Sequence, residues 1–178
     1  MSKKGIGAVL LLVAMLFLQV VVLDNVDING YIVPYAYVLG IIAVSLRFGR
    51  AKAMFVAFAA GAVMDLFQQT GGLHAMACTL VAFVCMPLAK VFFGVHEKQP
   101  EEFDPLEAKS SRTAGLALLF VLLLLHHIVL YFFEVLNIGA VFSVLWHAML
   151  NAAVSFVVSV VVLSLISIRG SRRKRSRL

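Results

Sequence analysis

The sequence predicts an all-α integral membrane protein with six transmembrane helices and both termini in the cytoplasm. The first observation is composition: 62% of the 178 residues are hydrophobic and 13% are charged, whereas a soluble domain has about 25% charged residues. The second is that apolar runs of about 20 residues, the length of a membrane-crossing helix, recur along the chain. The third is a complete separation of positive charge between alternate connecting segments. These features exclude a soluble enzyme, a disordered regulator and a disulfide-rich secreted domain.

We expect the six spans to form one membrane domain over residues 1–178. The first span follows a basic start typical of a signal peptide, but no small-residue cleavage site follows it, so we expect a retained helix. Pro34 suits the first turn of the second span, where the missing N–H has no partner. The last span, about 45 Å long as one helix, must tilt, kink or protrude. The expected spans are 5–23, 31–46, 51–67, 73–93, 114–133 and 138–168.

Positive charge supports this arrangement. If the amino terminus is cytoplasmic, segments 1–4, 47–52, 90–113 and 169–178 carry 2, 3, 4 and 6 Lys or Arg residues, which account for all 15 in the chain. The connecting segments on the opposite side carry acidic residues and no basic one. Because membrane proteins retain Lys and Arg in their cytoplasmic segments, this sorting favours six spans over five or seven.

Two cytoplasmic segments are candidate contact regions. The tail at 169–178 is basic, and we expect Arg169–Arg177 to contact anionic lipid at about 1 kcal/mol per basic residue, with partner binding as the alternative and no role in nucleic-acid binding. The loop at 94–113 has mixed charge, two prolines and five acidic residues. We expect this loop to be solvated and poorly ordered, and it is the one sizeable site for a soluble partner.

Polar residues in the last two spans are candidate functional residues, because polar groups in a membrane are costly. His126 and His127 interrupt a leucine run, and Glu134 follows on the same helix face as His127. His147 and Asn151 share one face of the last span. A turn centred between these spans would bring His127 and His147 to the same depth, about 15 Å from the turn. The sequence therefore predicts a polar cluster inside the bundle.

We interpret that cluster first as interhelical hydrogen bonding, at roughly 0.6 kcal/mol per bond. A proton relay, a zinc site and contacts to a partner's transmembrane helix are the alternatives. Adjacent histidines point about 100° apart on a helix. We therefore expect only one of His126 and His127 to join the cluster, and the other to face a different neighbour, such as another protein.

The third span and the turn after it form a second candidate region. Ala53, Ala57 and Gly61 recur every four residues, a spacing that lets helices approach closely in lipid. We expect close packing inside the bundle, with a heteromeric contact as the alternative. Asp65 and His74 flank a tight turn at Gly71-Gly72 and are placed to hydrogen-bond across it.

Motifs of intramembrane catalysis are missing from the sequence. It contains no H-E-x-x-H, no pair of membrane aspartates, no G-x-S-x-G and no glycine-rich phosphate loop with its lysine. Cys78 and Cys85 are seven residues apart on one helix, about 10 Å, which is too far for a disulfide. We therefore expect no enzyme activity, no cofactor and no catalytic or metal-binding residue.

The order of several motifs resembles the MreD family, small integral membrane proteins of the bacterial rod-shape machinery. The matching stretches are Gly30-Tyr-Ile-Val-Pro-Tyr-Ala-Tyr37, Gly61-Ala-Val-Met-Asp-Leu-Phe67 and Gly71-Gly-Leu-His-Ala75. The His126-His127 pair with Glu134 downstream is similar to one branch of the family. The length and the six-span layout match over essentially the whole chain.

This resemblance implies a non-catalytic scaffold in the bacterial cytoplasmic (inner) membrane. It implies binding to MreC, and work with MreB, with RodA and with RodA's penicillin-binding transpeptidase partner, in coupling the cytoskeleton to lateral peptidoglycan synthesis. The family is also similar in fold to the substrate-binding subunits of energy-coupling-factor vitamin transporters. That similarity supplies the alternative function, a small-molecule substrate-binding subunit of a membrane transporter. The first span lacks the small-residue stripe through which such subunits dock their coupling protein.

Overall fold

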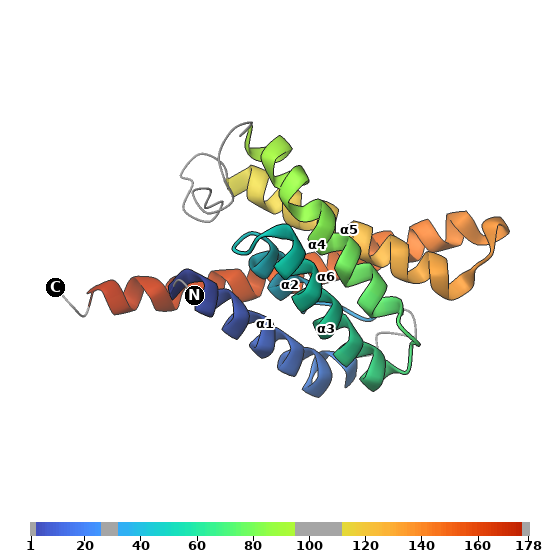
Figure 1. The fold of residues 1–178 in the computed structure, drawn as a ribbon, viewed down its shortest axis with the longest axis horizontal. Helices are drawn as coiled ribbons and strands as arrows, with labels where there is room; N and C mark the ends of the chain where they lie inside the picture. The colour runs from blue at the N-terminus through green and yellow to red at the C-terminus, as the bar shows by residue number, and fades with distance from the viewer. Residues whose placement is uncertain (1–2, 26–31, 95–111, 176–178) are drawn as a thin grey trace.

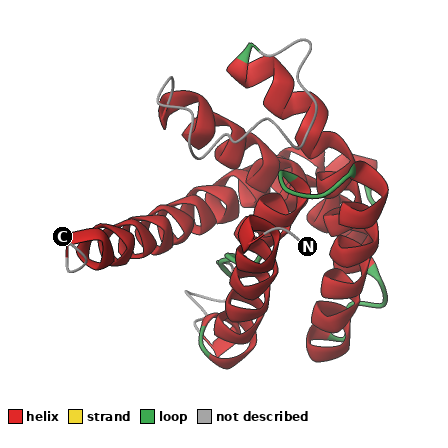
Figure 2. Ribbon diagram, turned by 60° about the vertical axis from the view of Figure 1, so that its left-hand side comes forward, coloured by secondary structure: helices red, strands yellow, loops and turns green. Residues whose placement is uncertain are grey.

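The computed structural model describes residues 3–25, 32–94 and 112–175, and of residues 3, 4, 138 and 167–175 only the backbone. The regular elements in these ranges are helical, and five of them are long and apolar enough to cross a membrane. The prediction of an all-α chain with membrane-spanning helices is confirmed at this level (Figures 1 and 2). The elements are α1 Lys3–Val21, η1 Leu23–Asn25, α2 Val38–Ser45, α3 Arg50–Gln68, α4 Leu73–Phe93, α5 Arg112–Val135, η2 Ile138–Ala140 and α6 Val141–Arg175.

The ends of the helices alternate along the long axis of the molecule. In Figure 1 the start of α1, the α2–α3 link, the end of α4, the start of α5 and the end of α6 lie toward the left. The end of α1, the α3–α4 turn and the α5–α6 link lie toward the right. Charge follows the same division: Arg47, Arg50, Lys90 and Arg112 belong to the left-hand ends, and the described acidic residues belong to the right-hand ones.

The second predicted span is not a transmembrane helix. Residues 32–36 are not helical, and α2 has 8 residues, or about 12 Å of helix. The sequence predicted Pro34 in the first turn of a helix, and this prediction is wrong: Pro34 lies in the non-helical segment before α2. The physical reason is that a residue before proline is restricted to extended conformations and that proline donates no hydrogen bond.

Helix α6 is longer than the span predicted at 138–168. It has 35 residues, about 52 Å, and it runs as one helix whose end extends past the other elements at the left of Figure 1. Because the helix is continuous, its tilt or protrusion in the membrane stays a prediction. The loop at 95–111 and the side chains of Arg169–Arg177 lie outside the described residues, so their predicted solvation and lipid contacts stay predictions.

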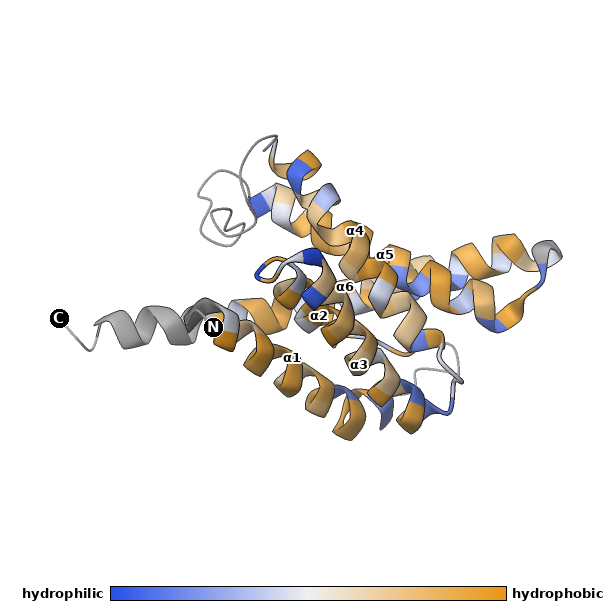
Figure 3. Ribbon diagram, viewed as in Figure 1, coloured by the Kyte–Doolittle hydropathy of each residue, from blue (hydrophilic) through white to orange (hydrophobic). Residues whose placement is uncertain are grey.

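Close packing of α3 on α4 organises the core. Ala53 and Ala57 are buried, and a Cβ added to Gly61 would lie 2.5 Å from Cα of Ala75. The predicted use of this small-residue stripe for packing inside the bundle is confirmed. Large apolar side chains such as Leu10, Phe17 and Phe55 are exposed, and most of the helical ribbon in Figure 3 has the colour of hydrophobic residues. Such a surface suits a lipid environment.

Candidate functional site: a buried polar network

Three polar side chains hold the extended segment that precedes α2. Gln19 of α1 donates from Nε2 to the Pro34 carbonyl (2.9 Å) and accepts at Oε1 from the N–H of Ala36 (3.0 Å). Two residues of α6 accept from two further N–H groups of this segment. Non-helical backbone at membrane depth must find partners inside the protein, since lipid offers none. Val33 N–H donates to Oδ1 of Asn151 (2.8 Å), and Tyr35 N–H donates to Oγ of Ser155 (2.9 Å).

A line of side-chain hydrogen bonds runs from the end of α1 into the centre of the bundle. Oδ1 of Asp24 accepts from Nε2 of Gln68 (2.9 Å), and Oε1 of Gln68 lies 2.7 Å from Nε2 of His74. Nδ1 of His74 lies 2.8 Å from the hydroxyl of Tyr37, and that hydroxyl lies 3.0 Å from Nε2 of His126. Five residues from five separate segments are thereby joined.

The Asp24 carboxylate determines the proton positions along this line. Because a carboxylate only accepts, the Gln68 amide must present its nitrogen to Asp24 and its oxygen to His74. His74 therefore carries its proton on Nε2, and its Nδ1 accepts from the Tyr37 hydroxyl. Since the hydroxyl has one proton, Tyr37 must accept from His126, which therefore also carries its proton on Nε2. One side-chain orientation thus fixes two histidine tautomers.

The Tyr37 oxygen is saturated in this arrangement. Besides the bond from His126, it has the thiol of Cys78 at 3.4 Å, so it donates once and accepts twice. Nδ1 of His126 is left as a fully buried acceptor without a hydrogen-bond partner in the described part of the chain. Cys78 and Cys85 are both buried and free, which confirms that they do not pair with each other.

His127 points to the other side of α5 and has the opposite tautomer. Its Nδ1 lies 2.8 Å from the Leu123 carbonyl, which can only accept, so Nδ1 carries the proton. Its Nε2 then accepts from the Ser155 hydroxyl at 3.3 Å. The ring of Tyr35 packs against both histidines, at 5.9 Å from His126 and 5.4 Å from His127. Both histidines are therefore buried within this chain; they face different neighbours, as expected, and these neighbours are residues of this chain and not another protein.

The cluster predicted from the last two spans does not form as expected. His127 meets Ser155 and not His147, while Nδ1 of His147 lies 2.7 Å from the Ser143 carbonyl in its own helix. Glu134 is exposed. The register differs by eight residues, about two turns, because η2 lengthens the α5–α6 link and because Ser155 also accepts from Tyr35 of the extended segment. Asn151 is buried; it accepts from the Val33 N–H of that segment and donates to the His147 carbonyl of its own helix.

The turn between α3 and α4 is built around Asp65. The predicted hydrogen bond to His74 is present, but the donor is the backbone N–H of His74 (2.9 Å) and not its ring. The same carboxylate accepts from the N–H of Ala75 (2.9 Å), so it caps the start of α4 and leaves the His74 ring free to reach Tyr37. Gly71 and Gly72 have φ of +63° and +104°, as the tight turn requires.

Sequence reasoning missed half of the network. Gln19 was noticeable as a polar residue in an otherwise apolar run, but its partners lie 15 and 17 residues away in a segment expected to be helical. Gln68 was taken as part of a turn, and Ser155 has no feature that separates it from other helical serines. Tyr35 and Tyr37 belong to a stretch that resembles the family, but nothing in that stretch predicts their contacts with His74 and His126.

The network joins α1, α3, α4, α5 and α6 to the extended segment, which suits it to hold the bundle in one arrangement. The described residues contain no group of three or more His, Cys, Asp or Glu side chains that could hold a metal ion, so the zinc site considered from the sequence has no support there. No protein-family model, curated protein or solved structure matches this chain.

Proposed function

We propose that this protein is a non-catalytic membrane scaffold of a bacterial rod-shape (elongation) complex, similar to MreD. It resides in the cytoplasmic membrane and binds MreC. Together with RodA and RodA's penicillin-binding transpeptidase partner, it helps to couple MreB filaments to lateral peptidoglycan synthesis. The loop at 94–113 is the region offered to soluble cytoplasmic partners.

The main support for this proposal is that residues from the motifs that resemble the family lie next to one another in the structure. Tyr37 comes from the first stretch, His74 from the third and His126 from the histidine pair, and all three share hydrogen bonds. Asp65, from the second stretch, caps the helix that carries His74. The resemblance therefore rests on residues that build one structural network, and this supports a scaffold in which those residues maintain the shape of the bundle.

We further propose six crossings with both termini cytoplasmic. The second crossing combines non-helical residues 32–35, about 14 Å long at most, the turn at 36–37 and the roughly 12 Å of α2, which together approach a hydrocarbon core of about 30 Å. The alternating helix ends and the basic residues at one end support this arrangement. Single cysteines at Asp27 and Pro100, which lie outside the described residues, and at Lys174, near the end of α6, test it. Labelling from outside at 27 alone is expected, and any reversal contradicts the topology.

The transporter alternative requires a ligand pocket that the polar and aromatic side chains do not supply. Tyr35, Tyr37 and His74 are the residues suited to line one, and their rings contact one another at 5.0 to 6.2 Å between centroids. Their polar atoms are bonded to protein groups. A vitamin-sized ligand would have to break this network before it entered.

Co-purification separates the two functions. The tagged protein is solubilised from its native membrane in mild detergent, with untagged membranes as the background. Recovery of MreC, with or without the wall synthases, is the expected result. Recovery of an ATPase with its coupling membrane subunit contradicts the scaffold and supports the transporter component.

A further inference from the structure

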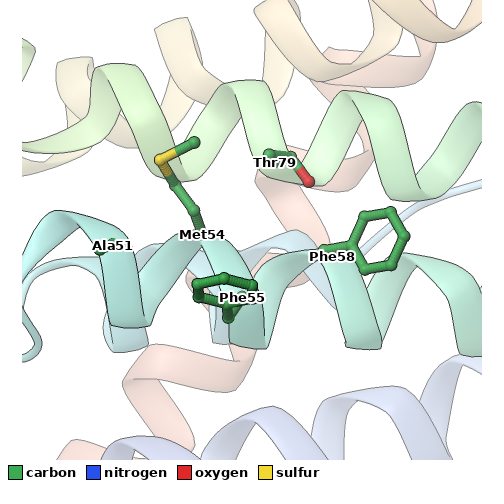
Figure 4. A pocket seen from close by; sticks show the side chains of 5 residues that line it. All are labelled: Ala51, Met54, Phe55, Phe58 and Thr79. Atoms are coloured by element: carbon green, nitrogen blue, oxygen red, sulfur yellow. The ribbon is translucent and has the colours of Figure 1, made fainter.

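An apolar groove lies between α3 and α4 on the outer face of the bundle. It has a volume of about 390 Å³ and is lined by Ala51, Met54, Phe55, Phe58 and Thr79. Figure 4 shows Met54 reaching from α3 toward α4 and Thr79 pointing back toward α3, so these two side chains close the floor. Phe55 and Phe58, which are 77% and 55% exposed, form the outer wall.

The lining of the groove is almost entirely apolar. The one hydroxyl in its lining, that of Thr79, donates to the Ala75 carbonyl at 2.7 Å within its own helix. A polar ligand would therefore find no free donor at this hydroxyl. A hydrocarbon chain fits the lining, because its contacts there are dispersion contacts with aromatic rings and small side chains.

Positive charge stands at one end of the groove. Arg50 precedes the lining residue Ala51, and its guanidinium carbon lies 4.9 Å from the ring centroid of Phe83, one turn beyond Thr79 on α4. Lys52 is exposed on the same turn of α3. Within the described ranges no carboxylate belongs to this end of the molecule, since Asp24, Asp65 and Glu134 belong to the other. The first-turn N–H groups of α3 add partial positive charge.

We propose that this groove binds an anionic phospholipid, with one acyl chain between Phe55 and Phe58 and the phosphate beside Arg50 and Lys52. An apolar slot that ends at two cations matches an amphiphile that carries negative charge next to its hydrocarbon chain. A second protein helix would leave those two cations without a counter-charge. The site does not depend on the scaffold function proposed above.

Fluorescence quenching by brominated lipids tests the site. The chain has one tryptophan, so Trp146→Phe with Phe55→Trp gives a single reporter in the groove. The protein is reconstituted with dibrominated phosphatidylglycerol or dibrominated phosphatidylcholine. We expect tighter binding of phosphatidylglycerol at this reporter, by about fivefold for each basic residue involved. The preference should disappear when Arg50→Gln and Lys52→Gln are added. The control reporter Leu66→Trp, exposed at the far end of α3, should show no preference.

Three results would overturn the proposal. Equal quenching by the two lipids at residue 55 would mean that the groove has no preference for negative charge. An equal preference at residue 66 would mean that it reflects the whole surface. Absence of quenching at residue 55 by either lipid would mean that protein covers the groove.

Native mass spectrometry gives a second, independent test. Ala51→Trp fills the groove, whereas Ala59→Trp, on an exposed position of α3 outside the lining, is the matched control. Ala51→Trp should carry fewer phosphatidylglycerol adducts than Ala59→Trp, since both variants keep the basic tail and any lipid that it binds. Equal adduct numbers for the two variants contradict the proposal.

Discussion

The hydroxyl of Tyr37 and the ring of His126, 89 residues apart in the sequence, meet at 3.0 Å in the middle of the bundle. This contact connects the segment that leads into α2 with α5. It also completes the line of hydrogen bonds that begins at Asp24. Its geometry determines which atoms lose a partner when either residue is changed.

Tyr37→Phe should destabilise the protein. It removes the donor to Nδ1 of His74, which is left buried and unpaired at a cost of about 1–3 kcal/mol. It also removes the hydroxyl acceptor of His126, whose Nε2 keeps only the sulfur of Cys78 at 3.8 Å. The measurement is the midpoint of thermal unfolding in detergent. Tyr131→Phe is the control, because the Tyr131 hydroxyl makes no hydrogen bond to the described residues; an equal, small effect of the two changes would argue against the network.

The histidine tautomers can be read by nitrogen NMR. With ¹⁵N-labelled histidine, His74 and His126 should appear as Nε2–H tautomers and His127 as the Nδ1–H tautomer. Each signal is assigned by its loss in the corresponding His→Gln variant. A proton on Nδ1 of His126 would contradict the order of donors that begins at Asp24, because Nε2 of His126 could then not donate to the Tyr37 hydroxyl.

Gly61→Ala should weaken the packing of α3 on α4. The added Cβ would lie 2.5 Å from Cα of Ala75 and from the His74 carbonyl oxygen, and backbone atoms have little freedom to move. Overpacking of this kind costs typically 1–3 kcal/mol. Gly115→Ala is the matched control, since its Cβ would meet only a side-chain atom of Phe93 at 3.8 Å. Equal unfolding midpoints for the two variants would contradict the close approach.

Paired cysteines test the register of α5 and α6. In a background without Cys78 and Cys85, His127→Cys with Ser155→Cys should crosslink with a short bifunctional thiol reagent, which replaces the reach of the His127 ring, whose Nε2 lies 3.3 Å from Oγ of Ser155. His127→Cys with His147→Cys, the pair expected from a symmetrical turn, should not. Crosslinking of the second pair and not the first would support the register in which His127 lies opposite His147.

The sequence predicted the features that depend on composition. Five spans have helical counterparts because long apolar runs and charged ends are local properties, and the Ala53–Gly61 spacing predicted close packing for the same reason. The extended segment was not predictable in this way. It is stable only because Gln19, Asn151 and Ser155, which lie far away in the sequence, accept its N–H groups. His126 and His127 were found because histidine is rare in a membrane, but their partners depend on a register that no local pattern fixes.

Amide hydrogen exchange across residues 33–36 tests the central claim most directly, which is that buried side chains hold a non-helical segment inside the bundle. In nanodiscs, the amides of Val33, Tyr35 and Ala36 should exchange slowly, and Gln19→Ala should speed exchange at Ala36 while Asn151→Ala speeds it at Val33. Slow exchange that neither variant alters would contradict the account, because it would mean that these amides are bonded within a continuous helix.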